Sequence, residues 1–280
     1  MLKAQPFKIP KKRHESITIQ VDKATSFYNK LHQHEEIQIS YIKKGEGKLL
    51  IADSAHSFKK DAIFCIGSNN PHLFQADKDC HEIQMISLFF TQKSFENSFI
   101  NIPELSQLNQ FFIRTELNFK VYSNTNDLQQ LMNAIVKSKK LTRLILFFQI
   151  IQKIINGENS VLSEFKSAKK ISDSEGKRMQ VVFDYVMNNF QNTILLEDVA
   201  ALVFMTPNAF CRFFKQRTNK TFFQFLIQLR IAHACQLLEN KTDISMENLA
   251  LASGFNSVSN FNRQFKSLKK CSPSSYKRQL

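Results

Sequence analysis

The sequence of 280 residues lacks the features that mark secreted or membrane-spanning chains. Its five cysteines are an odd number, lie far apart and form no Cys-x-x-Cys pair, so we expect neither a disulfide framework nor a thiolate zinc site. The N-terminus has no apolar core for a signal peptide. The most apolar stretch, Leu141 to Ile155, is interrupted by polar and charged residues and is too short to span a bilayer. We therefore expect a cytoplasmic protein with no membrane partner.

Acidic residues are scarce relative to basic ones, and the formal net charge is +14. Such an excess favours a polyanionic partner, either nucleic acid or an anionic membrane surface. The excess is spread over both halves of the chain, so charge alone does not locate a binding site. One segment stands out, because Ser253 to Leu280 contains no acidic residue and carries phenylalanines at helical spacing among lysines and arginines.

The first part of the chain has the pattern of short strands. Between residues 15 and 92, segments such as EIQISYI, AIFCIG and EIQMISLFF are separated by turn sequences such as KKGEG and GSNNP. This spacing is typical of a β-sandwich or barrel. From about residue 103 the apolar residues recur at helical spacing, most clearly in two segments within 126–156. These helices either pack on the barrel or use part of their wide apolar faces as a dimer interface, and both interpretations stay open.

The last hundred residues contain an internal repeat. Leu196, Val199 and Ala200 correspond to Met246, Leu249 and Ala250 at an offset of 50, and the following segment from Thr206 corresponds to that from Ser257 at an offset of 51. Each copy has the pattern of helix, short turn and helix, with Thr206 or Ser257 as the N-cap of the second helix. One extra residue in the turn of the second copy accounts for the change of offset. A long helix, about Phe222 to Leu238, joins the copies.

The second helices of the two copies, predicted at 206–217 and 257–269, have one apolar and one polar face. Phe210 and Phe214 form the apolar stripe in the first copy, and Phe261, Phe265 and Leu268 form it in the second. The polar stripe places short hydrogen-bonding residues first, then an arginine, then a lysine. Arginine can bond guanine, asparagine can bond adenine and lysine neutralises phosphate, so this order suits a helix in a DNA major groove. The residues of the stripe and its caps are Thr206, Asn208, Cys211, Arg212, Lys215, Ser257, Ser259, Asn262, Arg263 and Lys266.

These residues resemble the DNA-binding domain of the bacterial AraC/XylS family of transcription regulators. The resemblance covers about the last hundred residues and is carried by Arg230, the pair Gly254-Phe255, the pair Phe265-Lys266, the pair Ser272-Pro273 and Tyr276. It implies double-stranded DNA and RNA polymerase as partners, and it adds Asn260 to the base-facing residues. Members of this family usually have glycine after each recognition helix, where we place Asn219 and Cys271 in this chain.

A group of histidines distinguishes the N-terminal half. His32, His34, Glu36 and Gln38 alternate along one predicted strand and so share a face, and His72 follows a turn. The arrangement resembles the cupin barrel that serves as the sensing domain of many regulators of the same family. In metal-binding cupins a glutamate stands where this chain has Gln38, a weaker ligand, and Glu36 would replace it only with a shifted geometry.

Three interpretations of the histidines stay open: a small-molecule pocket, structural residues at the barrel mouth, and a metal site. We adopt the first, with His32, His34, Gln38 and His72 as the candidate effector pocket, and we expect no metal and no cofactor.

The sequence therefore predicts an α+β protein of two domains. The N-terminal domain is a cupin-like β-barrel with a helical hairpin, and the C-terminal domain is all-α with two helix-turn-helix units. The expected boundaries are 1–125 for sensing, 126–156 for a helical and dimerising region, 157–177 for a flexible linker and 178–280 for DNA binding. We expect a sequence-specific, effector-responsive transcription regulator that is not an enzyme, and that forms a homodimer if the helices of 126–156 pair. The alternatives are a metal-dependent cupin enzyme with a helical appendage and a DNA-binding regulator without an effector.

Overall fold

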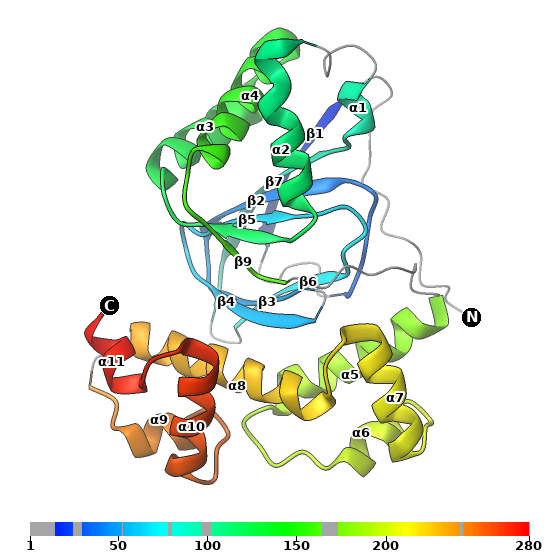
Figure 1. The fold of residues 1–280 in the computed structure, drawn as a ribbon, viewed down its shortest axis with the longest axis vertical. Helices are drawn as coiled ribbons and strands as arrows, with labels where there is room; N and C mark the ends of the chain where they lie inside the picture. Colours follow the sequence, from blue (N-terminus) through cyan, green and yellow to red (C-terminus); the bar gives the residue numbers. More distant parts are fainter. Residues whose placement is uncertain are drawn as a thin grey trace. The chain divides into compact units, whose positions relative to one another are not determined.

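Apart from Asp53–Ser57, which group with the helical unit, the described chain divides near residue 170 into two compact units, one rich in β-structure and one helical (Figure 1). The structure is a computed structural model and describes residues 15–24, 30–51, 53–77, 80–96, 102–163, 173–240 and 243–279. The expected combination of a β-rich N-terminal domain and a helical C-terminal domain is confirmed. No helix among these residues has the length and apolar character needed to cross a membrane.

The N-terminal unit contains two antiparallel sheets. Its strands are β1 (Ile17–Ala24), β2 (Ile37–Lys44), β3 (Gly47–Ile51), β4 (Ser54–Phe58), β5 (Ile63–Ile66), β6 (His72–Ala76), β7 (Ile83–Phe90), β8 (Phe119–Val121) and β9 (Asn159–Val161). The larger sheet has the order β1-β7-β2-β5-β8-β9 and the smaller one the order β4-β3-β6. Where we expected a barrel, the described strands form these two sheets and no closed cylinder.

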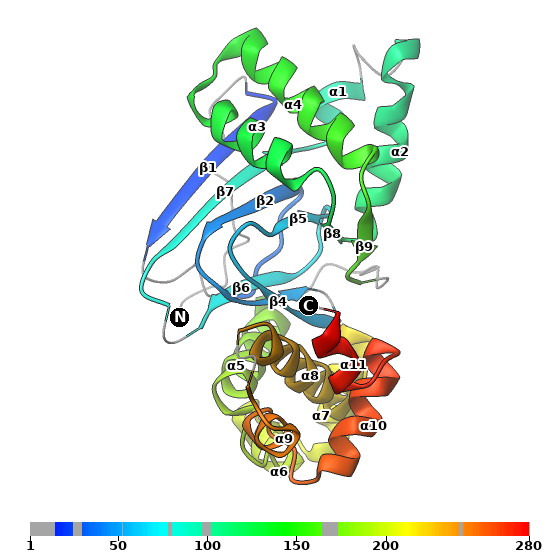
Figure 2. The same ribbon diagram turned by 90° about the vertical axis from the view of Figure 1, so that its left-hand side faces the viewer.

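The larger sheet lies between a layer of helices and the smaller sheet (Figure 2). The helices are α1 (Lys93–Glu96), a 3-10 turn η1 (Pro103–Leu105), α2 (Ser106–Thr115), α3 (Thr125–Lys137) and α4 (Lys140–Ile155). Because side chains alternate along a strand, Ile37, Ile39 and Tyr41 of β2 pack with the helices. Gln38, Ser40 and Ile42 of the same strand point to the other face, toward the smaller sheet. Two of these inward residues are polar and fully buried, which places a polar group inside the core.

The segment expected to be a flexible linker, 157–177, is largely structured where it is described. Its first part contains β9, which pairs with β8 at the edge of the larger sheet, and its last part begins α5 (Asp173–Asn189). Residues 164–172 lie outside the described residues. The linker expectation is therefore corrected for both ends of the segment. Low apolar content misled the prediction, because an edge strand of three residues needs little apolar surface.

The C-terminal unit consists of seven helices among its described residues: α5, α6 (Leu196–Leu202), α7 (Pro207–Thr218), α8 (Phe222–Asn240), α9 (Met246–Ala252), α10 (Val258–Lys269) and α11 (Pro273–Arg278). Figure 1 shows α8 running along the unit, with α5, α6 and α7 at one end and α9, α10 and α11 at the other. The long connector predicted at 222–238 is thus α8.

Helix α8 contributes to two separate aromatic cores. Near its start, Phe222 and Phe225 contact Phe214 of α7, with ring centroids 5.5 and 5.7 Å apart. Near its end, Ile231, Cys235 and Leu238 pack with a second cluster that includes Phe261 and Phe265 of α10. Each helix-turn-helix copy therefore has a core of its own, and α8 contributes side chains to both.

Candidate nucleic-acid interface and histidine cluster

The two helix-turn-helix copies have helices of the same lengths, and their second helices have the same kind of cap. Helices α6 and α9 have 7 residues each, and α7 and α10 have 12 residues each. The side chain of Thr206 accepts a hydrogen bond from the Ala209 amide at the start of α7, and Ser257 accepts one from the Asn260 amide at the start of α10. These caps satisfy amides that the helix leaves unpaired, so each helix begins at the same place in its copy.

The turns of the two copies differ by one residue and one side chain. The amide of Met205 bonds the carbonyl of Ala200 in the first turn, as that of Phe255 bonds Ala250 in the second. Because Met205 precedes the cap directly and Phe255 does not, the extra residue of the second copy is Asn256. The preceding residue has a left-handed backbone in both copies, with φ 56° at Phe204 and 84° at Gly254.

Gly254 is required on two grounds. Its backbone conformation favours glycine, and a Cβ there would lie 2.6 Å from the carbonyl oxygen of Phe190 and 2.8 Å from Nε of Arg230. Phe204, by contrast, adopts the same conformation with a side chain that is 96% exposed.

Arg230 of α8 holds the second turn against the end of α5. Its Nε donates to the Phe190 carbonyl at 2.7 Å and its terminal nitrogen donates to the Asn192 carbonyl at 2.8 Å. The guanidinium also lies over the ring of Phe255, 5.8 Å from the centroid. This one side chain joins the loop after α5 to the turn between α9 and α10, and so ties the two halves of the unit together.

Every residue predicted to face DNA is exposed. In the first copy these are Thr206, Asn208, Cys211, Arg212 and Lys215, and in the second they are Ser257, Ser259, Asn260, Asn262, Arg263 and Lys266. Among the described residues, no ion pair involves the four cationic side chains of this set. The guanidinium of Arg263 donates to Oδ1 of Asn260 at 3.0 Å, which orients it along α10. Both helices therefore present cations and hydrogen-bonding groups outward.

Two details of these helices differ from the prediction. Leu268, expected on the buried stripe, is 38% exposed, whereas Phe213, which we did not predict, is buried. The left-handed residues that end α7 and α10 are Asn219 and Lys270, so Cys271 does not occupy the position of the family's glycine. The error is one of counting, because the offset of 51 relates Asn219 to residue 270.

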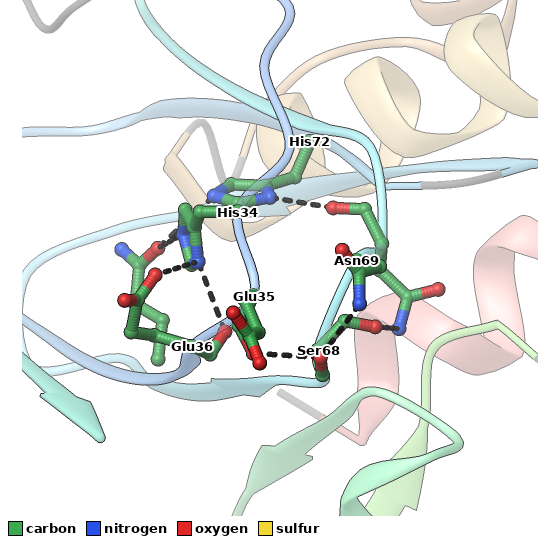
Figure 3. A network of polar contacts seen from close by, with 8 residues as sticks. His34, Glu35, Glu36, Ser68, Asn69 and His72 are labelled. Carbon is green, nitrogen blue, oxygen red and sulfur yellow. Dashed lines mark hydrogen bonds and ion pairs between the residues drawn. The ribbon is translucent and has the colours of Figure 1, made fainter. Parts of the chain in front are cut away.

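The four candidate pocket residues lie together inside the N-terminal unit. His32 and His72 form a bridge between their backbones, with hydrogen bonds of 3.1 and 2.9 Å, and their ring centroids are 4.3 Å apart. His34 and His72 lie with centroids 5.0 Å apart (Figure 3). His34, Gln38 and His72 are buried and His32 is half-buried.

The same ring nitrogen of each histidine faces a backbone carbonyl. Nδ1 lies 2.8 Å from the Lys30 carbonyl in His32, 2.9 Å from the Glu36 carbonyl in His34 and 2.8 Å from the Asn70 carbonyl in His72. A carbonyl only accepts, so each Nδ1 carries the proton and each neutral ring keeps its lone pair on Nε2. Burial lowers the pKa of His32 to about 4, and burial and the two neighbouring histidines lower the pKa of His72 well below its usual value.

Gln38 joins two of the three imidazoles to a pair of serines. Its Oε1 lies 3.1 Å from Nε2 of His34 and 3.0 Å from Nε2 of His72. Its Nε2 lies 2.7 Å from Oγ of Ser40 and 3.3 Å from Oγ of Ser87. Glu36 is on the opposite side of His34, with its carboxylate 3.7 Å from Nδ1. The carboxylate of Glu36 therefore does not enter the space between the imidazoles. It does not take the place of Gln38, which the sequence analysis had left open.

A cavity of about 330 Å³ is lined by residues that neighbour His34 and His72 in the chain, but not by any of the four candidate pocket residues themselves. It is lined by Glu35, Ser68, Asn69 and Asn70, which lie on the loops that carry His34 and His72, and by Lys93 and Phe112. Lys93 Nζ lies 3.3 Å from Oε1 of Glu35. Figure 3 shows Glu35, Ser68 and Asn69 beside the two histidines. Sequence patterns did not single out this cavity, because its lining comes from loops, from the start of β2 and from helices α1 and α2, which lie far apart in the sequence.

Two family models match the chain. Residues 14–143 match an AraC-like ligand binding domain, and residues 199–279 match a helix-turn-helix domain. Together they cover both units described above.

Two relatives match most of the chain. One is the HTH-type transcriptional activator RhaR of Mannheimia succiniciproducens, 24% identical over 88% of this chain and 86% of that protein. Another is the HTH-type transcriptional regulator YdeC of Bacillus subtilis, 25% identical over 90% of this chain and 87% of that protein. Among solved structures, ToxT from Vibrio cholerae matches with 15% identity and a TM-score of 0.37, over 95% of this chain and 99% of that one.

Proposed function

Because this chain belongs to the AraC/XylS family of transcription regulators, we propose that it reads DNA with α7 and α10 in two successive major grooves. The observation that carries the proposal is the repetition of one exposed pattern, a cap, a polar residue, an arginine and a lysine, on two helices of equal length. A solvated helix face has no reason to keep this pattern twice. A shared connector such as α8 can hold two reading helices about one DNA turn, ~34 Å, apart.

Each exposed residue has a role suited to its chemistry. Arg212 and Arg263 bond guanine, and the amide of Asn262 bonds adenine. Lys215 and Lys266 neutralise phosphates and set affinity without setting sequence. Thr206 and Ser257 hold the helix N-termini, whose unpaired amides favour a phosphate.

A selection of binding sites from random duplex DNA with the full-length protein tests this proposal. We expect an enriched motif with two short blocks about one helical turn apart. A motif with a single block would leave only one of the two helices as a reader. Binding that enriches no motif and vanishes as salt rises would reduce the interface to non-specific charge.

The N-terminal domain is, in this proposal, an effector-binding domain that shifts the regulator between states of different DNA affinity. An effector can do so only if it binds one of the states more tightly. The buried histidine cluster and the cavity described above supply the polar groups for such a ligand. A thermal-shift screen of small molecules tests the proposal, because a ligand of the native state raises its melting temperature. A screen in which no compound shifts the melting temperature or the DNA affinity would favour regulation by abundance alone.

The remaining partners follow from the same role. A transcription regulator of this kind acts in the cytoplasm, binds and does not catalyse, and contacts RNA polymerase. A homodimer would pair the α4 helices, where Leu141 and Ile145 are 67% and 50% exposed. Sedimentation of the protein and of Ile145→Lys tests this point, because a charge in an apolar interface dissociates the dimer. A wild-type protein that sediments as a monomer at all concentrations would refute it.

A further inference from the structure

Besides α8, the loop that follows α5 also joins the two helix-turn-helix copies. Helix α5 belongs to the first copy, because the ring centroid of Phe183 lies 6.3 Å from that of Phe214 and 5.3 Å from that of Phe225. The loop after α5 reaches the second copy, where the side chain of Gln191 donates to the carbonyl of Ala252 at 2.9 Å. The second copy is therefore held at two places, and a rotation about the axis of α8 would break the contact with the loop.

Arg230 lies where this loop, α8 and the second turn meet. Both of its hydrogen bonds go to the loop, to the carbonyls of Phe190 and Asn192 at 2.7 and 2.8 Å. These carbonyls follow the C-terminal end of α5, where the unpaired carbonyls of a helix favour a cation. Among the described residues no carboxylate pairs with Arg230, so its charge is directed at the backbone of the loop.

The contact between the loop and the second turn is closely packed. A Cβ at Gly254 would lie 2.9 Å from Cα of Gln191 and 2.8 Å from Nε of Arg230. The ring of His233, one turn further along α8, packs edge-on against Phe190 with centroids 5.1 Å apart, and its Nε2 lies 3.2 Å from Nε2 of Gln191. Side chains that fill their space in this manner leave the loop and the turn few alternative positions. We call Phe190, Gln191, Arg230, His233 and Gly254 the junction.

The first turn is not covered as the second is. Phe204 takes the place of Gly254 there, with the same left-handed backbone, and its side chain is 96% exposed. The two turns nevertheless form the same backbone hydrogen bond, from Met205 to Ala200 and from Phe255 to Ala250. A contact that was needed to build such a turn would occur in both copies. The junction therefore concerns the relation between the copies and not the conformation of one turn.

We propose that Arg230 and Gln191 are positioning residues, which fix the orientation of α10 relative to α7 and so determine the half-site spacing that the protein accepts. This inference rests on the proposed function, because it requires α7 and α10 to read one duplex together. Two linked binding modules gain most when their connection matches the distance between their sites. Each added base pair moves a half-site by about 3.4 Å and turns it by about 34° around the duplex, so a rigid pair of reading helices rejects a shifted half-site.

Binding of the full-length protein to a series of duplexes tests the proposal. The series carries the two blocks of the selected motif at their own spacing, at spacings that are longer or shorter by one base pair, and each block alone. We expect the wild-type protein to lose roughly tenfold or more in affinity when the spacing changes by one base pair. Arg230→Gln should bind the original spacing roughly tenfold more weakly and distinguish the spacings by about twofold or less. Its binding to either block alone should change by less than about twofold, because the core of each copy is intact.

Two further variants and a control refine the test. Arg230→Lys keeps the charge but lacks the planar fork that reaches two carbonyls, so it should relax the spacing preference as Arg230→Gln does. Gln191→Ala removes an exposed side chain, acts in the same direction and keeps the proposal falsifiable if a change at Arg230 prevents folding. Gln228→Ala is the matched control, because Gln228 lies on the same helix and accepts a hydrogen bond from Lys220, away from the junction. It should keep the wild-type spacing preference.

The outcomes separate this inference from the function on which it rests. The inference is overturned if Arg230→Gln and Gln191→Ala keep the wild-type spacing preference. It is also overturned if they lose affinity equally at every spacing and on each block alone, because that pattern reports only a loss of folded protein. A wild-type protein that gains nothing from the second block at any spacing refutes the proposed function as well, and this result appears before any residue is changed.

Discussion

The two helix-turn-helix copies share a backbone and differ in what they place on it. Arg212 and Lys215 of the first copy correspond to Arg263 and Lys266 of the second, so the cations are the same. The residues that precede the arginine are not the same, because Ala209 and Cys211 stand where the second copy has Asn260 and Asn262. A thiol is a weak hydrogen-bond donor and a methyl group is none, whereas an amide both donates and accepts.

The turns of the two copies also differ, and the difference again favours the second copy. The second copy has glycine at its left-handed position, packed against Phe190 and Arg230, and the first has the exposed Phe204. The second copy therefore has the more closely packed turn and more hydrogen-bonding groups to read bases, while the first has the same cations and an exposed residue at its turn. The comparison shows that two copies of one repeat can keep the same backbone geometry while their side chains differ in how well they can read bases.

The largest effect of a single substitution is expected at Gly254, where the two turns differ. In Gly254→Ala the new methyl group meets the Phe190 carbonyl and the backbone stays left-handed, so we expect the free energy of unfolding of the C-terminal unit to fall by about 2–4 kcal/mol. Urea unfolding followed by circular dichroism measures the change. Ala252→Gly, two residues earlier at the end of α9, is a control for altered chain entropy. Unchanged stability in Gly254→Ala would contradict this expectation, because the turn would then accommodate a Cβ despite these contacts.

The arginines test whether the second copy reads bases more strictly. We expect Arg263→Ala to weaken binding to the selected site by about 1–3 kcal/mol and to relax preference at one base pair. Arg212→Ala should cost less, because the guanidinium of Arg263 is oriented by Asn260 and the corresponding residue of the first copy is Ala209. Binding of both variants to selected and random duplexes at one salt concentration gives the answer. An equal loss on the two kinds of DNA would reassign Arg263 to phosphate contact.

The weaker reader can be made more like the stronger one. Cys211→Asn gives α7 the amide that α10 has at Asn262, and we expect about 1 kcal/mol of added discrimination for one base pair of the first half-site. The measurement is a repeated site selection with the variant. Cys211→Ala is the matched control, since it removes the thiol without adding an amide. If Cys211→Asn and Cys211→Ala select the same motif, position 211 does not face a base.

The smallest effect is expected at Phe204. Phe204→Gly relieves a left-handed backbone at an exposed side chain, and we expect stability to rise by about 0.5–1 kcal/mol, because the relief exceeds the added entropy of the unfolded chain. Thermal unfolding measures this. A loss of stability would mean that the phenylalanine ring makes contacts that its exposure of 96% conceals.

Local chemistry explains which parts of the fold could be predicted. Thr206 and Ser257 act through their own helices, so the bounds of α7 and α10 were predicted to within one residue. The pair β8 and β9 was missed because each strand has three residues and their pairing spans two helices. Leu268 was misplaced because the last turn of α10 extends past the core that its spacing suggested.

The candidate sites show the same difference between features that local sequence determines and features that distant parts of the chain determine. The predicted alternation of His32, His34, Glu36 and Gln38 along one strand is wrong, because β2 begins only at Ile37 and Glu36 lies on the other side of His34 from Gln38. Which nitrogen of each histidine faces inward depends on carbonyls of Lys30, Glu36 and Asn70, and these positions follow from loop conformations that no pattern encodes.

Because α8 belongs to two cores, its length sets the orientation of one proposed reading helix relative to the other. Its first turns belong to one core and its last turns to the other, so a residue inserted between Leu229 and Ile231 would rotate one reading helix against the other by about 100° and shift it by about 1.5 Å. The relative position of the two half-sites on the duplex thus depends on the number of residues in α8, which is not itself a proposed reading helix.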